Sequence, residues 1–147
     1  DFIHENLKWS IKYNLGVDCT APKHIFVKEE YADTVYKIDG TEQDECGDID
    51  HFAPVATWSC FKDIKDLIKQ VNTFNNRLGL HLYTKDLSVK RYVVEHARWG
   101  TIFVNKPLTV PVEMPHSGLG ASGNTFNQSF FKIYQYLVPK HIVVGDQ

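Results

Sequence analysis

The sequence predicts an α/β fold: an open, mostly parallel twisted sheet with flanking helices. Short apolar segments rich in β-branched residues recur along the chain, and amphipathic segments with helical spacing alternate with them. Parallel neighbours cannot be joined by tight hairpins and need a crossover connection, usually a helix. The alternation therefore favours a parallel sheet.

The first half of the chain begins with an amphipathic pattern. Ile3, Leu7 and Ile11 recur at four-residue spacing and predict a helix. In chain order, the expected elements are this helix ending near residues 14–16, a strand at 24–27, a helix at 30–38, an acidic loop at 40–50 and a strand at 55–60.

The clearest helix of the sequence lies in the second half. Its apolar residues follow i, i+3, i+4, i+7 spacing behind Asp63 as the N-cap: Ile64, Leu67, Ile68 and Val71. Gly79 is expected to end it as a C′ glycine. The elements expected after it are a strand at 80–83, a helix at 87–97 ended by Gly100, a strand at 101–104, a long ordered loop at 106–125, a helix at about 128–136 and a strand at 141–144.

Composition limits the classes of partner. The 147 residues are 43% hydrophobic, which predicts one globular domain over residues 1–147. A net charge of -2 without a Lys/Arg run argues against nucleic acid and anionic membranes as partners. No apolar stretch has the length of a membrane span, and the N-terminus lacks the order of a signal peptide. The first residue is Asp1 and not Met, so a removed targeting segment stays an open alternative.

Cysteine and histidine usage predicts neither disulfides nor a metal site. Cys19, Cys46 and Cys60 form no CxxC pair, and their odd number favours reduced thiols. We therefore expect a reducing compartment, with the cytoplasm favoured and the mitochondrion left open. The seven histidines include no i, i+4 pair, so no zinc site is expected.

Five short motifs follow one another along the chain. They are Asn14-Leu15-Gly16-Val17-Asp18-Cys19-Thr20-Ala21-Pro22, Asp50-His51-Phe52-Ala53-Pro54-Val55, Asn75 with Leu78-Gly79-Leu80 and Thr84-Lys85-Asp86, Gly100-Thr101-Ile102-Phe103-Val104-Asn105, and Pro115-His116-Ser117-Gly118-Leu119-Gly120-Ala121-Ser122-Gly123. In this order they resemble the aldehyde dehydrogenase signatures N-x-G-Q-x-C-x-A-P, E-x-F-G-P-V, N-x-x-x-x-G-L with T-x-D, G-x-x-x-V-N and P-F-G-G-x-x-x-S-G.

The resemblance implies the fold of an aldehyde dehydrogenase catalytic domain, with Cys19 at the nucleophile position. It implies that Asp50 stands where the family has the glutamate that holds the nicotinamide ribose, with Phe52 in the same motif. The family's general-base glutamate, oxyanion asparagine and cofactor domain would all precede Asp1. The chain is therefore expected to be a shortened relative, and to bind NAD(P) only if a partner supplies the missing domain.

Departures from the family pattern favour an unreactive cysteine. The usual glutamine is Val17, and Asp18 places a negative charge beside the thiol, which disfavours the thiolate. We expect Cys19 to have an ordinary or raised pKa and to be retained by descent. Phe52 stands, like Asp50, at a cofactor-binding position of the family; we expect it to be a core aromatic residue, with a nicotinamide contact as the alternative.

The remaining candidate residues lie in strands and loops. In the family the last motif borders the substrate entrance, so Asn105 and His116 are candidates for contact with a ligand. His116 has the alternative of a solvated or backbone-bonded histidine. Cys60 is expected to be buried and inert, and Cys46 to be exposed in the acidic loop. The glycines at 118, 120 and 123 do not link a strand to a helix, so they predict no phosphate loop.

Two functions stay open at this point. The first is a non-catalytic interaction or assembly subunit, a pseudoenzyme. The second is a residual thiol enzyme, or an aldehyde dehydrogenase fragment that oxidises an aldehyde through Cys19 with a separate cofactor-binding partner. For the first, a strand with an unpaired edge is expected to contact another protein or a second copy of the chain. That strand consists of His141, Ile142, Val143 and Val144.

Overall fold

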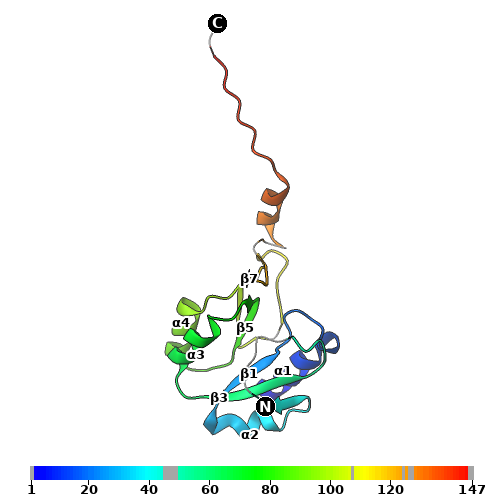
Figure 1. Ribbon diagram of the computed structural model, residues 1–147, viewed down its shortest axis with the longest axis vertical. Helices are drawn as coiled ribbons and strands as arrows, with labels where there is room; N and C mark the ends of the chain where they lie inside the picture. Colours follow the sequence, from blue (N-terminus) through cyan, green and yellow to red (C-terminus); the bar gives the residue numbers. More distant parts are fainter. Residues whose placement is uncertain (1, 45–49, 107, 124, 126–127, 146–147) are drawn as a thin grey trace.

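The computed structural model describes residues 2–44, 50–106, 108–123, 125 and 128–145 (Figure 1). Its helices are α1 (Phe2–Lys12), α2 (Ala32–Tyr36), α3 (Ile64–Val71) and α4 (Leu87–His96), with 3₁₀ helices η1 (Tyr13–Gly16), η2 (Glu29–Tyr31) and η3 (Phe130–Tyr136). Its strands are β1 (His24–Lys28), β2 (Thr41–Gln43), β3 (Ala56–Phe61), β4 (Asn76–Arg77), β5 (Gly79–Leu82), β6 (Thr101–Val104) and β7 (Leu119–Gly120).

Most strand pairs are parallel. β3 lies between β1 and β2 and pairs with both in parallel, and β5 pairs with β6 in parallel. The short pair β4 and β7 is antiparallel. The predicted α/β fold with mostly parallel strands is confirmed, but the described strands form three separate sheets rather than one open sheet.

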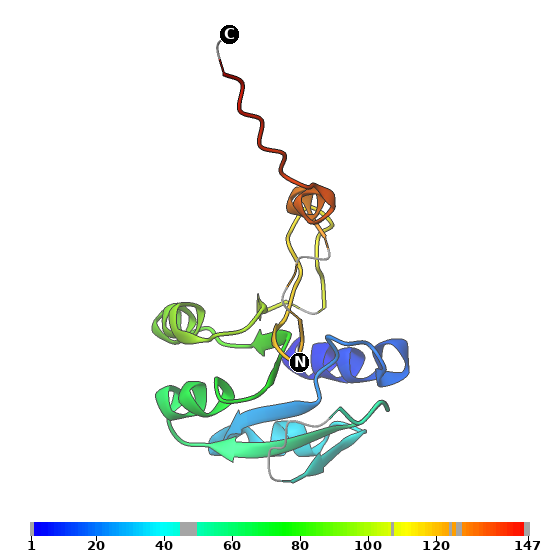
Figure 2. The ribbon, with the colours of Figure 1, turned by 45° about the horizontal axis from the view of Figure 1, so that its top comes forward.

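Two apolar clusters cover the two faces of the β1–β3–β2 sheet. Successive side chains of a strand point to opposite faces, so Ile25 and Val27 join one cluster and Phe26 joins the other. The first cluster receives α1 and α2, and the second receives α3 and α4. Figure 2 shows α3 and α4 stacked on one side of the molecule, with α1 on the other.

The two helices of the second cluster begin at aspartate caps. Asp63 Oδ1 accepts hydrogen bonds from the Lys65 and Asp66 N–H groups at 2.8 and 3.1 Å, which confirms the predicted cap. Asp86 caps α4 in the same way.

The glycines predicted to end these two helices do not end them, although the predicted span of 87–97 for the second helix agrees with α4 to within one residue. α3 ends at Val71, and its C-cap residue Asn72, which keeps a helical backbone conformation, bonds through its side chain to the backbone of His96 and Arg98 at 2.9 and 2.7 Å. Gly79 instead begins β5. α4 ends at His96, well before Gly100.

Three further boundaries differ from the prediction. The helix expected at 30–38 is split into η2 and the shorter α2. The loop at 106–125 contains β7, whose partner β4 was not expected. The helix expected at 128–136 is the 3₁₀ helix η3.

The prediction of a strand at 141–144 is also wrong for the isolated chain. Residues 137–145 belong to no helix or strand, and they run away from the body of the molecule (Figure 1). A β-ladder needs a second strand to share its hydrogen bonds, and at this distance the described part of the chain supplies none. In the same described part, no helix has the length and hydropathy to cross a membrane.

Candidate functional site

The turn that carries Cys19 follows directly after α1. Asn14, Leu15 and Gly16 have φ angles of 48°, 57° and 74°, so three successive residues adopt left-handed backbone. The Val17 N–H donates to the Asn14 carbonyl at 3.2 Å and closes this reversal. The chain thereby leaves the helix axis and presents Cys19 at the surface before it enters β1.

The loop at 50–54 lies directly against this turn. A Cβ atom on Gly16 would overlap the carbonyl group of Ala53 and the Cα atom of Pro54. Only glycine fits at this approach and tolerates this φ angle without strain. The structure thus brings the cysteine motif and the Asp50–Pro54 motif into contact.

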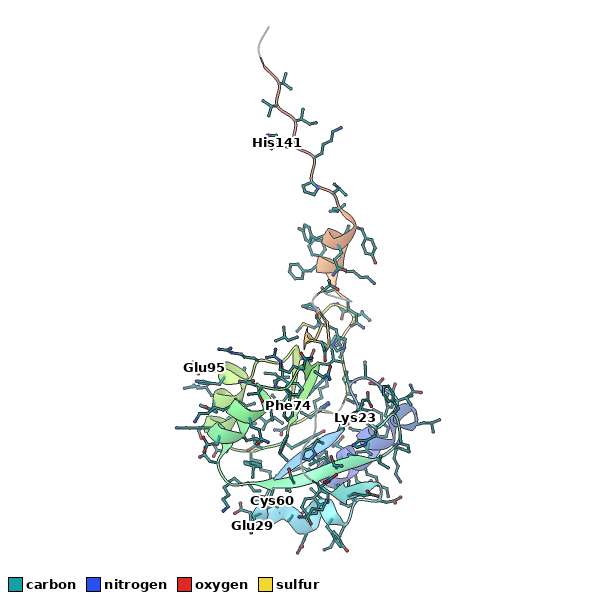
Figure 3. All side chains as sticks on the ribbon, in the orientation of Figure 1. Lys23, Glu29, Cys60, Phe74, Glu95 and His141 are labelled. Atoms are coloured by element: carbon teal, nitrogen blue, oxygen red, sulfur yellow. The ribbon has the colours of Figure 1, made fainter. Side chains whose placement is uncertain are left out.

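Lys23 joins the same two segments. Its ammonium donates to the Gly16 carbonyl and lies 2.9 Å from Asp50 Oδ1. The Lys23 side chain is 18% exposed and that of Asp50 is 38% exposed, so this ion pair is partly shielded from water. Figure 3 shows Lys23 within the body of the molecule, near the beginning of β1.

The Asp50 carboxylate is held in its charged form. Partial burial opposes ionisation, but the Phe52 N–H, which donates to Oδ1 at 3.0 Å, and the Lys23 ammonium outweigh it and lower the pKa of Asp50. Asp50 therefore stays negative at neutral pH and has Lys23 as its counter-ion.

The Cys19 thiol has a raised pKa, in the direction that the sequence predicts. Partial burial of the thiol contributes most, although the residue as a whole is exposed, and the negative charge of Asp18 follows. Asp50 adds a smaller contribution, and Lys23 opposes it. Asp18 Oδ1 accepts from the Thr20 N–H and hydroxyl at 2.8 and 2.6 Å, which fixes its charge in the turn. The thiol is thus predominantly protonated at neutral pH.

His81 supports the turn from β5. Its Nε2–H donates to the Thr20 carbonyl at 3.1 Å, and its ring stacks on Phe103 with centroids 4.5 Å apart. Burial lowers the pKa of His81, so the ring is neutral. His81 was not among the predicted site residues, although a histidine inside an apolar strand pattern was a usable signal.

Asn105 joins the ends of β5 and β6. Its Oδ1 accepts from the Thr84 N–H at 2.9 Å, and its Nδ2 donates to the Thr84 carbonyl at 2.8 Å. The positive φ of 52° at Asn105 aims the side chain back at this turn. Both polar atoms of the Asn105 side chain are therefore committed to the protein backbone.

The last motif, residues 115–123, packs closely against the chain's own backbone. His116 Nδ1 lies 3.1 Å from the Thr101 hydroxyl, so its partner is a side chain and not the backbone. A Cβ atom at Gly100 would overlap the carbonyl of Ser117, and one at Gly118 would overlap Ser122. These glycines leave room for neighbouring backbone rather than for a ligand.

Phe52 is not a core residue, which corrects the prediction. Its side chain is 71% exposed, and its φ angle is 49°. The bond from the Phe52 N–H to Asp50 tightens the turn and leaves the ring at the surface, while Ala53 faces Gly16.

Cys60 is exposed, so its predicted burial is also wrong. It lies on the face of β3 that carries the buried Ala56 and Trp58, but near the end of the strand, where the core no longer covers that face. Figure 3 shows Cys60 at the same end of the molecule as Glu29. Cys46 lies outside the described residues.

A polar cluster on the sheet was not predicted. His24 Nδ1 and Nε2 lie 2.6 and 2.8 Å from the hydroxyls of Thr57 and Ser59, at successive positions on one face of β3. Burial lowers the pKa of His24 to about 4, against an opposing contribution from Asp44. The neutral ring bonds to both hydroxyls and thereby ties β1 to β3.

A surface groove of about 490 Å³ follows α1. Its lining residues are Glu5, Lys8, Trp9, Lys12, Tyr13 and Asn14. The groove reaches the beginning of the cysteine turn, but Cys19 itself does not line it. In the part of the chain that the structure describes, no three His, Cys, Asp or Glu side chains are grouped to hold a metal ion.

Comparisons with a family model and with individual known proteins identify the same family. A model of the aldehyde dehydrogenase family matches residues 37–142. Cytosolic aldehyde dehydrogenase 1 of Mus musculus is 32% identical over 93 residues, which are 63% of this chain and 19% of that protein. Its counterpart in Rattus norvegicus is 28% identical over 144 residues, which are 98% of this chain and 28% of that protein. The chain therefore spans less than a third of the length of these relatives.

Solved structures agree on the fold. Lactaldehyde dehydrogenase from Escherichia coli superposes with a TM-score of 0.83 at 13% identity, covering 92% of this chain and 42% of that one. Betaine aldehyde dehydrogenase from Staphylococcus aureus superposes with a TM-score of 0.82 at 16% identity, covering 96% of this chain and 42% of that one. The matched family model and the five motifs in register together place this chain in the aldehyde dehydrogenase family.

Proposed function

We propose that this chain is a non-catalytic interaction module of the aldehyde dehydrogenase family, and that it binds another protein chain through residues 130–145, here named the C-terminal arm. The observation that carries the proposal is the exposure of the arm. Its apolar side chains reach solvent, with Val138 at 90% and Val144 at 85% exposed. Soluble proteins rarely leave an apolar patch of this kind uncovered unless it contacts a partner.

The backbone of the arm supports the same function. Residues 137–145 belong to no helix or strand and lie away from the body (Figure 1). Backbone N–H and C=O groups outside a sheet are available to extend a sheet edge of another chain. The β-branched side chains of Ile142, Val143 and Val144 suit a strand that forms on contact. A second copy of this chain is the simplest partner, because most soluble oligomers are homo-oligomers.

The surroundings of Cys19 support a non-catalytic role. A thiol acts as a nucleophile when a nearby cation or base favours its thiolate. Here partial burial, Asp18 and Asp50 raise the pKa of Cys19 and outweigh the opposing charge of Lys23, and the side chain of Asn105 is committed to Thr84. These contacts favour a thiol that stays protonated and does not act as a nucleophile.

The geometry also argues against a nicotinamide dinucleotide. Asp50, which stands at the family's ribose-binding position, already has Lys23 as its counter-ion. The spaces beside Gly100 and Gly118 hold the chain's own backbone. These contacts support our proposal that the chain alone binds neither NAD nor NADP.

The deciding experiment measures molar mass by light scattering over a range of protein concentrations. The parent chain is compared with the double variant Ile142→Lys/Val144→Lys, which places two charges on one side of the extended arm. Val94→Lys, at an exposed position of α4, is the matched control. We expect the parent and the control to oligomerise and the double variant to be monomeric. The proposal would be overturned by a parent chain that stays monomeric at high concentration and whose molar mass does not increase when another aldehyde dehydrogenase is added.

A thiol-dependent activity at Cys19 is the second candidate, and the exposure of Cys19 is the observation that favours it. Its test is the hydrolysis of an activated aryl ester by the parent chain and by Cys19→Ser. Turnover that disappears in the serine variant would favour this candidate over the non-catalytic role.

A further inference from the structure

The Lys23 side chain contacts both loops around Cys19 through polar bonds. The Gly16 carbonyl belongs to the cysteine turn, and Asp50 belongs to the loop that lies against it. The Lys23 side chain is mostly shielded, so its ammonium has little water to replace these partners. Loss of Lys23 would therefore leave a carbonyl and a carboxylate without their cation.

The same ammonium balances the charges beside the thiol. Asp18 from the turn and Asp50 from the facing loop are both negative and raise the pKa of Cys19 after partial burial, and the positive charge of Lys23 makes a smaller, opposing contribution. His51, next to Asp50, helps to lower the pKa of that carboxyl, and the neutral His81 faces the turn from β5. Coulombic effects between groups a few ångströms apart are large where water is partly excluded.

We infer that Lys23 is a positioning residue for Cys19. Its ammonium holds the cysteine turn against the 50–54 loop, and its positive charge acts on the thiol in the direction opposite to the negative charge of Asp50. This inference does not depend on the C-terminal arm or on whether Cys19 performs catalysis. If Lys23 and Asp50 control the thiol through their charges, removal of the Lys23 charge and removal of the Asp50 charge must change the reactivity of Cys19 in opposite directions.

The test measures the alkylation rate of Cys19 by iodoacetamide against pH. It uses the full chain carrying Cys46→Ser and Cys60→Ser, so that Cys19 is the one reactive thiol. The variants are Lys23→Met, Lys23→Arg and Asp50→Asn. Below the titration midpoint we expect Lys23→Met to alkylate about threefold more slowly and Asp50→Asn about threefold faster, because each changes the thiolate fraction. Lys23→Arg should behave like the parent, since it keeps the charge.

A different result is expected if the ion pair only holds the two loops together and its charges do not act on the thiol. Loosening of either loop would uncover the thiol, so Lys23→Met and Asp50→Asn would shift the titration midpoint in the same direction. That outcome would overturn the inference. Thermal unfolding of each variant verifies that it is folded. If Lys23→Met does not fold, Lys23→Gln replaces it, because its amide can still donate to Gly16 but carries no charge. A midpoint unchanged in Lys23→Gln would equally contradict the inference.

Discussion

The Asn105 carboxamide and the Thr84 backbone are joined by two hydrogen bonds, one in each direction. Oδ1 accepts at 2.9 Å and Nδ2 donates at 2.8 Å. Because Asn105 follows β6 and Thr84 follows β5, the pair fastens the carboxyl ends of two parallel strands. The asparagine of the fourth motif thus has a structural role in this chain.

Replacement of Asn105 by alanine should destabilise the fold. Both backbone groups of Thr84 would lose their partner, at a cost of about 1–3 kcal/mol in the free energy of unfolding. Urea denaturation followed by tryptophan fluorescence measures this change. Asn105→Asp, which keeps the acceptor and loses the donor, should fall between the parent and the alanine variant. An unchanged midpoint for Asn105→Ala would show that the two bonds contribute nothing.

Replacement of Gly16 by alanine should be more severe. The new Cβ atom would overlap the Ala53 carbonyl, and the φ angle of 74° adds strain for any residue with a side chain. We expect a loss of about 3 kcal/mol or more in the free energy of unfolding. Gly145→Ala is the matched control, because no atom lies within 4 Å of its Cβ position, and its stability should equal that of the parent. Equal stability of the two variants would contradict the close contact of the loops.

The stability of the fold should decrease on acidification through His24. The pKa of His24 is about 4 in the folded chain, against an ordinary value of 6.5. Between these values the unfolded chain binds more protons, so the contribution of His24 to stability is full above pH 6.5 and is lost as the pH falls toward 4.

The measurement compares chemical denaturation at pH 7 and pH 5. His24→Asn should lose less stability on acidification than the parent does. His141→Asn, at an exposed position of the C-terminal arm, should follow the parent. A His24→Asn chain with the same pH dependence as the parent would refute the assignment.

Calorimetric titration with NAD and with NADP should give no saturable heat. The physical reason is that Lys23 neutralises Asp50 and that backbone fills the glycine spaces of the last motif. Titration of Lys23→Met under the same conditions tests whether release of Asp50 changes the result. Saturable binding at micromolar concentration by the parent chain would overturn the non-catalytic proposal.

Features that depend on neighbouring residues follow from the sequence alone. The helix α3 was predicted from the spacing of Ile64, Leu67, Ile68 and Val71, and its N-cap from Asp63. Periodicity and capping act within one or two turns, so the sequence contains all the partners. The order of the five motifs likewise identified the family without any knowledge of their contacts.

The tertiary structure decided which distant segments meet. The contact of Gly16 with Ala53, the ion pair of Lys23 with Asp50 and the bond from His81 to Thr20 all join residues that are remote in the chain. The exposure of Cys60 depends on where the core ends, and a strand pattern cannot show this. A strand at 141–144 needs a partner to share its hydrogen bonds, and the folded body lies too far away to provide it.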